Sequence, residues 1–79
     1  MVKIKGEGSD TNPIVISECN NSEGVDCEHK ELKRRFGNYK LLKQVLINKD
    51  NHFYDKLIIK TEGEVKEIFF DISDFFGKY

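Results

Sequence analysis

Long hydrophobic runs are missing from this sequence. The longest apolar runs span three residues each, at 14–16, 45–47, 57–59 and 68–70. A membrane-spanning helix needs roughly 18 apolar residues, so none of these runs is a candidate. The first residues of the chain also lack the apolar core region of a signal peptide. We therefore expect a cytoplasmic protein with no membrane association.

Cysteine is scarce, with only Cys19 and Cys27 in the chain. Small domains that depend on disulfides for stability carry more cysteines than this. In a reducing cytoplasm we expect two free thiols. A Cys19–Cys27 bridge, which would close a short loop, is the alternative.

The common catalytic motifs are absent. The chain contains no G-x-S-x-G, P-loop, dinucleotide-binding or H-E-x-x-H pattern. Cys27 and His29 could form a nucleophile and base, but side chains two residues apart on a helix do not face each other. A chain of 79 residues also has little room for a substrate pocket of about 300 Å³ or more. We expect no enzymatic activity and no catalytic residues.

A metal or cofactor site is not indicated either. The spacing of the two cysteines with His29 and His52 does not suit tetrahedral zinc. The acidic loops contain no EF-hand pattern, so their oxygen atoms do not predict a calcium site. We expect no bound metal and no cofactor.

What the sequence does contain is typical of one small folded domain. It has 79 residues, of which 38% are hydrophobic and 34% charged. These values predict a single globular domain over residues 1–79. Apolar alternation or β-prone composition predicts strands in five segments: Val2–Lys5, Ile14–Ile16, Tyr39–Ile47, Phe53–Thr61 and Val65–Ile72.

A single helix is predicted between the second and third of these strands, at about residues 27–36. Asp26 could cap its first turn, because the carboxylate accepts hydrogen bonds from free amides there. Gly37 is a natural residue for the end of a helix. At helical spacing the predicted apolar stripe comprises Val25, His29, Leu32 and Phe36.

The predicted order is β-β-α-β-β-β, a small α+β fold. We expect an antiparallel sheet of four or five strands with the helix packed on one face. In the first strand after the helix, Leu41 should share a face with Lys43, Val45 and Ile47, because side chains alternate along a strand.

The last strands are apolar on both faces, which one short helix cannot cover. Leu57 and Ile59 should point opposite to Ile58, and Phe69 opposite to its neighbours. The second face must be covered by the N-terminal strands, by the Phe75-Phe76 segment or by another chain. Exposed apolar patches on small proteins often mark interaction sites. The candidate interface residues are Ile58, Phe69, Phe75 and Phe76.

Charge is segregated although the net charge is only −1. Residues 6–29 carry acidic side chains and no Lys or Arg, whereas residues 30–49 are mostly basic. Clustered Lys and Arg can bind phosphates without special spacing. The candidate anion-binding residues are Lys30, Lys33, Arg34, Arg35, Lys40 and Lys43.

These features favour a small protein-interaction module, with an accessory, inhibitor or antidote role, acting through an apolar sheet face. Its partner would be another protein or a second copy of the chain. The alternative is an anion- or nucleic-acid-binding module that uses the basic residues of segment 30–49. The abundance of Lys, Ile, Asn and Phe, with little Ala or Pro, is typical of an AT-rich bacterial or phage gene.

Overall fold

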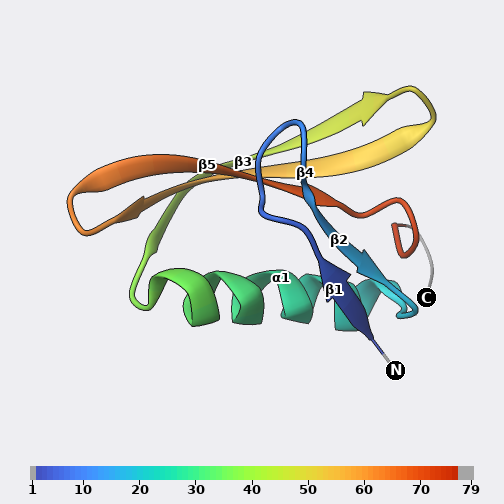
Figure 1. The fold of residues 1–79 in the computed structure, drawn as a ribbon, viewed down its shortest axis with the longest axis horizontal. Helices are drawn as coiled ribbons and strands as arrows, with labels where there is room; N and C mark the ends of the chain where they lie inside the picture. The colour runs from blue at the N-terminus through green and yellow to red at the C-terminus, as the bar shows by residue number, and fades with distance from the viewer. Residues whose placement is uncertain (1, 77–79) are drawn as a thin grey trace.

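A computed structural model describes residues 2–76 and contains one helix and five strands within them (Figure 1). The elements follow the predicted order: β1 Lys3–Lys5, β2 Ile14–Ser17, α1 Asn21–Phe36, β3 Lys40–Lys49, β4 His52–Thr61 and β5 Glu64–Asp71. The predicted α+β class and the helix between the second and third strands are therefore confirmed. No helix in this part of the chain is long and apolar enough to cross a bilayer.

The strands form one sheet in the order β1-β2-β5-β4-β3. Three neighbouring pairs are antiparallel, as expected, but β2 runs parallel to β5, with Ile14 beside Phe70. The sheet is therefore mixed rather than purely antiparallel. The parallel pair is possible because α1 and the β3–β4 hairpin lie between β2 and β5 in sequence, which gives the chain length that a parallel connection requires.

The helix begins earlier than the sequence predicted. Asn20, not Asp26, caps it: the Asn20 side chain accepts from the Glu23 backbone N–H at 2.9 Å, and the Glu23 carboxylate accepts from the Asn20 N–H at 3.1 Å. This reciprocal capping box satisfies two otherwise free donors. The predicted end is correct, because Gly37 has a φ of 70° and donates to the Lys33 carbonyl. The helix therefore spans 16 residues.

The predicted stripe is correct only in its second half, because Leu32 is buried in the core and Phe36 packs against that core. Val25 and His29 are exposed, and the buried positions are Gly24, Glu28, Glu31 and Leu32. Gly24 allows the helix to approach closely, since a Cβ at this position would lie 2.5 Å from the Phe75 ring. The longer helix thus lies against the sheet through a glycine and two carboxyls as well as through apolar side chains.

The hydrophobic core lies between α1 and the adjoining face of the sheet (Figure 1). Its members come from β2, α1, β4, β5 and the turn that follows β5: Ile14, Ile16, Leu32, Leu57, Ile59, Ile68, Phe70, Ile72 and Phe75. Leu57 and Ile59 point into it while Ile58 points away, as the alternation predicted. The core is therefore one layer thick, between one helix and one side of the sheet.

Candidate functional site

One face of the sheet carries no helix. Figure 1 shows α1 on one side of the sheet only. Because paired residues on neighbouring strands share a face, the register defines the residues directed away from α1. We call this the outer face; on β3, β4 and β5 it comprises Lys40, Lys43, Val45, Ile47, Lys49, His52, Tyr54, Lys56, Ile58, Lys60, Val65, Glu67, Phe69 and Asp71.

The segments predicted to cover the outer face do not do so. The N-terminal strands extend the sheet at its edge, and Phe75 packs on the opposite side, against Gly24. Asp10, in the loop between β1 and β2, lines a hollow of 390 Å³ together with outer-face residues such as Tyr54 and Phe69. The sequence predicted three ways to cover the second face of the sheet. Of these, cover by another chain is the one that the described residues do not test.

Strand β3 is an edge of the sheet as well as part of the outer face. Within residues 2–76 it pairs only with β4. Leu42 and Leu46 on this strand are 46% and 53% exposed. A bulge between Leu41 and Lys43 shifts the register, so Leu41 pairs with Ile59 and shares the side of α1 rather than the side of Lys43. The predicted face of Leu41 was wrong because an extra residue reverses the alternation.

The four candidate interface residues are distributed over both sides of the sheet. Ile58 and Phe69 lie half-buried on the outer face. Phe75 is only 1% exposed in the core, so it is not part of a surface. Phe76 is exposed and stacks on Phe53, with ring centroids 4.6 Å apart.

The candidate anion-binding residues do not form one patch. Lys30, Lys33, Arg34 and Arg35 belong to α1, whereas Lys40 and Lys43 lie on the outer face, across the sheet. On the helix, Lys30 pairs with Asp26 at 2.8 Å, and both arginines bind Glu31. The Arg34 hydrogen bond is the largest influence that lowers the pKa of the Glu31 carboxyl. These cations are close together in the sequence, but the fold places them on opposite sides of the sheet.

Arg35 also has a structural role. It donates to the backbone carbonyls of Glu7 and Gly6, at 3.1 and 2.9 Å. Together with the ion pair to Glu31, these bonds tie the segment after β1 to the last turns of α1. An arginine held by three acceptors is less able to bind a phosphate than a free one.

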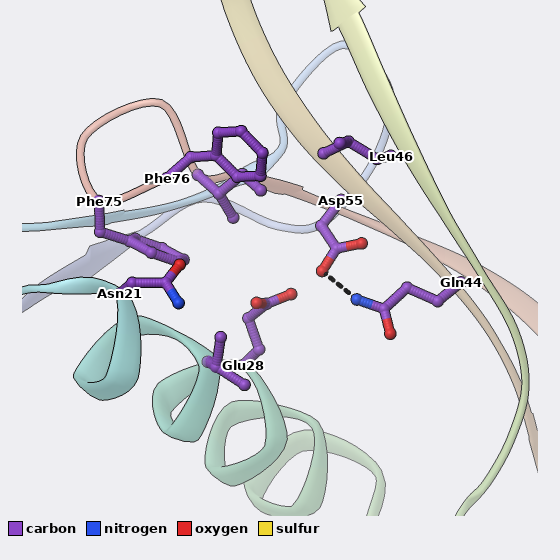
Figure 2. A pocket seen from close by; sticks show the side chains of 9 residues that line it. Asn21, Glu28, Gln44, Leu46, Asp55, Phe75 and Phe76 are labelled. Atoms are coloured by element: carbon purple, nitrogen blue, oxygen red, sulfur yellow. Dashed lines mark hydrogen bonds between the residues drawn. The ribbon is translucent and has the colours of Figure 1, made fainter. Parts of the chain in front are cut away.

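A second site, which the sequence did not reveal, lies on the helix side. A cavity of 360 Å³ opens between the first half of α1, the β3–β4 hairpin and the turn after β5 (Figure 2). Figure 2 shows the Glu28 and Asp55 side chains entering it from opposite elements. The full lining is Asn21, Val25, Glu28, Gln44, Leu46, Asp55, Ile72, Phe75 and Phe76.

The two carboxyl groups in this cavity are almost fully buried. Glu28 is 3% exposed and Asp55 is 4% exposed. Gln44 donates from its side-chain amide to Asp55 at 2.7 Å, while Glu28 Oε2 has no hydrogen-bond partner. Burial raises the pKa of the Glu28 carboxyl from its ordinary 4.5 to about 9, and the neighbouring Asp55 carboxyl is the second cause. The raised pKa keeps the Glu28 carboxyl protonated at neutral pH, and in this form it can donate to the neighbouring Asp55 carboxyl.

The remaining sequence candidates are separate from this cavity. Cys19 and Cys27 are unbridged, and burial raises the pKa of each thiol. His29 lies 3.3 Å from the Tyr39 hydroxyl, and His52 lies 3.3 Å from the Ser73 hydroxyl. The described part of the chain brings together no cluster of three or more His, Cys, Asp or Glu that could hold a metal.

Comparisons of the chain with protein-family models, with curated proteins and with solved structures found no match.

Proposed function

We propose that this protein is a small interaction module that binds an acidic, extended segment of a partner protein along β3 and the adjoining outer face. The observation that carries the proposal is the ten-residue edge strand β3, which has exposed leucines and no neighbour on one side within residues 2–76. The free N–H and C=O groups of such an edge can pair with an added strand. The function is binding rather than catalysis.

The charge of the outer face favours an acidic partner. Lysines contributed by β3 and β4 outnumber the acids of β5 on this face, which are Glu67 and Asp71. Glu67 already accepts from Lys56 at 2.6 Å, and Asp71 accepts from the Ser73 hydroxyl at 2.7 Å. Lys40 and Lys43 on β3 form no ion pair within the described residues, and an acidic segment would supply one. Lys49 lines a hollow together with Asp10 and Asp50.

The same lysines argue against a second copy of the chain as the partner. Pairing β3 with itself would place the Lys40, Lys43 and Lys49 side chains of both copies along one pair of strands. Like charges on directly opposed strands are destabilising. We therefore expect the free protein to be a monomer in sedimentation experiments, and a stable dimer through β3 would contradict the proposal.

A nucleic acid is the second candidate partner, and one observation favours it. Tyr54 and Phe69 lie on adjacent strands of the outer face, where Lys56 Nζ is 5.6 Å from the Phe69 ring centre. Single-stranded nucleic acids bind to such combinations of rings and cations. Asp10 and Asp71 near these rings would repel phosphates, so we rank this candidate second.

A titration followed by amide chemical shifts tests the proposal. The probe is a capped ten-residue peptide of alternating Glu and Val; the comparison peptide carries Lys in place of Glu, and a mixed single-stranded oligonucleotide is the third probe. We expect the acidic peptide alone to bind, with the largest shifts in β3. Lys43→Glu should weaken its binding roughly tenfold, because it reverses a charge at the proposed interface.

Lys33→Glu is the matched control for this experiment. It makes the same charge change on an exposed helix position, on the other side of the sheet. Equal weakening by both substitutions would mean that only the overall charge matters, which would contradict a site on β3. Salt-sensitive binding of the oligonucleotide without binding of the peptide would replace the proposal with the nucleic-acid alternative.

A further inference from the structure

The cavity between α1 and the β3–β4 hairpin contains two buried carboxyl groups and no Lys, Arg or His among its lining residues. Neither Glu28 nor Asp55 forms an ion pair with a Lys, Arg or His of the described chain. Asp55 has the Gln44 amide as its hydrogen-bond donor, and Glu28 Oε2 has none. A buried carboxylate is normally paired with a cation, because its removal from water is costly. The Gln44 amide and the hydrogen bond between the two carboxyls leave Glu28 Oε2 as the unsatisfied atom, and a cation that entered the cavity would satisfy it.

The walls of the cavity restrict what that cation can be. Val25, Leu46, Ile72, Phe75 and Phe76 supply aliphatic and aromatic surface, while the oxygens are concentrated around the two carboxyls. Figure 2 shows Phe75, Phe76 and Leu46 around the two carboxyls, with Asn21 beside Phe75 and Gln44 beside Asp55. A hydrated divalent ion would gain little from apolar walls and would need more oxygen ligands than two carboxyls provide.

We propose that this cavity binds a primary alkylammonium group, with the nitrogen between Glu28 and Asp55 and the alkyl chain against Leu46 and Phe76. The Asp55 carboxylate supplies the opposite charge, and oxygens of Glu28 and of the flanking Asn21 or Gln44 can accept the ammonium protons. The Phe75 and Phe76 rings add a favourable environment for a cation. The volume of 360 Å³ is at the lower end for small-molecule sites and suits a short chain.

The same chemistry can come from a free amine or from a lysine side chain of a partner. Two probes separate these sources: n-butylammonium for the free amine, and N-acetyl-lysine-methylamide for the peptide-borne group. 1-Butanol is the neutral control, and magnesium and calcium are the divalent controls. Titrations would follow the side-chain amide signals of Gln44 and Asn21, which line the cavity.

We expect at least one ammonium probe to bind saturably with a Kd of about 1 mM or lower, and butanol to bind at least tenfold more weakly. The tighter of the two ammonium probes identifies the source. Asp55→Asn should weaken ammonium binding roughly tenfold or more, because it removes the charge. Glu28→Gln should weaken binding less than Asp55→Asn does, because the amide keeps one oxygen that can accept an ammonium proton.

Glu64→Gln is the matched control, because it removes an exposed carboxylate on β5, outside the cavity lining, and should leave binding unchanged. Circular dichroism confirms that each variant is folded before titration. The proposal is overturned if neither probe binds at concentrations tenfold above about 1 mM. Equal binding of butanol, equal loss with Glu64→Gln, or tighter binding of a divalent ion than of either ammonium probe would also overturn it. Leu46 on β3 borders both sites, but the two proposals remain distinguishable because they use different probes and different variants: Asp55→Asn tests the cavity, whereas Lys43→Glu tests the outer face.

Discussion

The helix-facing side of the sheet has two halves that differ sharply in burial. Over β2 and β5, Ile14, Ile16 and Phe70 are fully buried beneath α1. On β3, Leu41 and Leu46 face the same side yet remain 38% and 53% exposed. We call the first region the closed half and the second the open half. The same sheet and the same helix therefore produce a dry core at one edge and an open cleft at the other.

The geometry of the elements explains the difference. An α-helix with its side chains is about 10 Å across, and neighbouring strands are about 4.8 Å apart. One helix can therefore cover about two or three strands, whereas this sheet has five. Covering the closed half leaves β3 outside the reach of α1. The exposed apolar surface therefore arises because the sheet has more strands than one helix can cover, and not because the covered strands pack poorly.

The largest expected effect is in the closed half. Phe70→Ala should lower the free energy of unfolding by about 3–5 kcal/mol, because it leaves a cavity in a fully buried site. For a domain of this size, such a loss should leave a large unfolded fraction. Urea titration followed by circular dichroism measures it. If Phe70→Ala cost no more than Leu46→Ala, the distinction between the two halves would fail.

Glu28→Gln, between the closed half and the open half, should have a smaller effect of opposite sign: it should raise the free energy of unfolding. Above about pH 4.5 the unfolded chain loses the Glu28 proton, whereas the folded chain keeps it up to about pH 9. The folded state therefore binds more protons across this range, and stability falls as the pH rises through it. Removing this titration should raise the free energy of unfolding at about pH 8 by roughly 1–3 kcal/mol and have little effect near pH 4.

Urea titrations from about pH 4 to about pH 9 check this prediction. Glu64→Gln, at an exposed position, serves as the control and should show no such pH-dependent gain. Asp55 on β4 faces Glu28 and is the other titratable group in the cavity, so Asp55→Asn should also reduce the pH dependence. If Glu28→Gln raised the free energy of unfolding equally at low and high pH, the Glu28 carboxyl would not be held protonated in the folded state.

The smallest effect is expected in the open half. Leu42→Lys should change the free energy of unfolding by less than about 0.5 kcal/mol, because the side chain is already 46% exposed at a bulge. Thermal unfolding with matched protein concentrations measures the change. A loss of several kcal/mol would show that β3 is stabilised by packing that the open half does not display.

Local patterns predicted most of the elements but not how they meet. The β-prone runs and Gly37 correctly located the strands and the helix end. The helix start was missed because Asn20 to Gly24 is typical of a loop, although Asn20 and Glu23 form a capping box. Gly24 is unfavourable in a helix by itself, and only the Phe75 ring explains it. Phe75 is distant from Gly24 in the sequence, so no local pattern shows that this helix position requires a glycine.

The candidate sites were less predictable than the fold. Alternation placed Ile58 and Phe69 on the outer face without tertiary information, although that face also carries five lysines. The basic segment 30–49 was misleading, because a turn carries its second half to the other side of the sheet. Glu28 and Asp55 are 27 positions apart, and each alone is typical of a solvated acid. Only the packing of α1 on β4 makes them a pair.

The parallel pairing of β2 with β5 also has a consequence for the order of folding. The β3–β4–β5 hairpins join residues close in sequence, whereas Ile14 meets Phe70 only after most of the chain has been ordered. Closing a long loop costs entropy before the contact repays it. The N-terminal strands should therefore dock last during folding and separate first under stress, so the C-terminal hairpins can persist while the β1–β2 unit detaches.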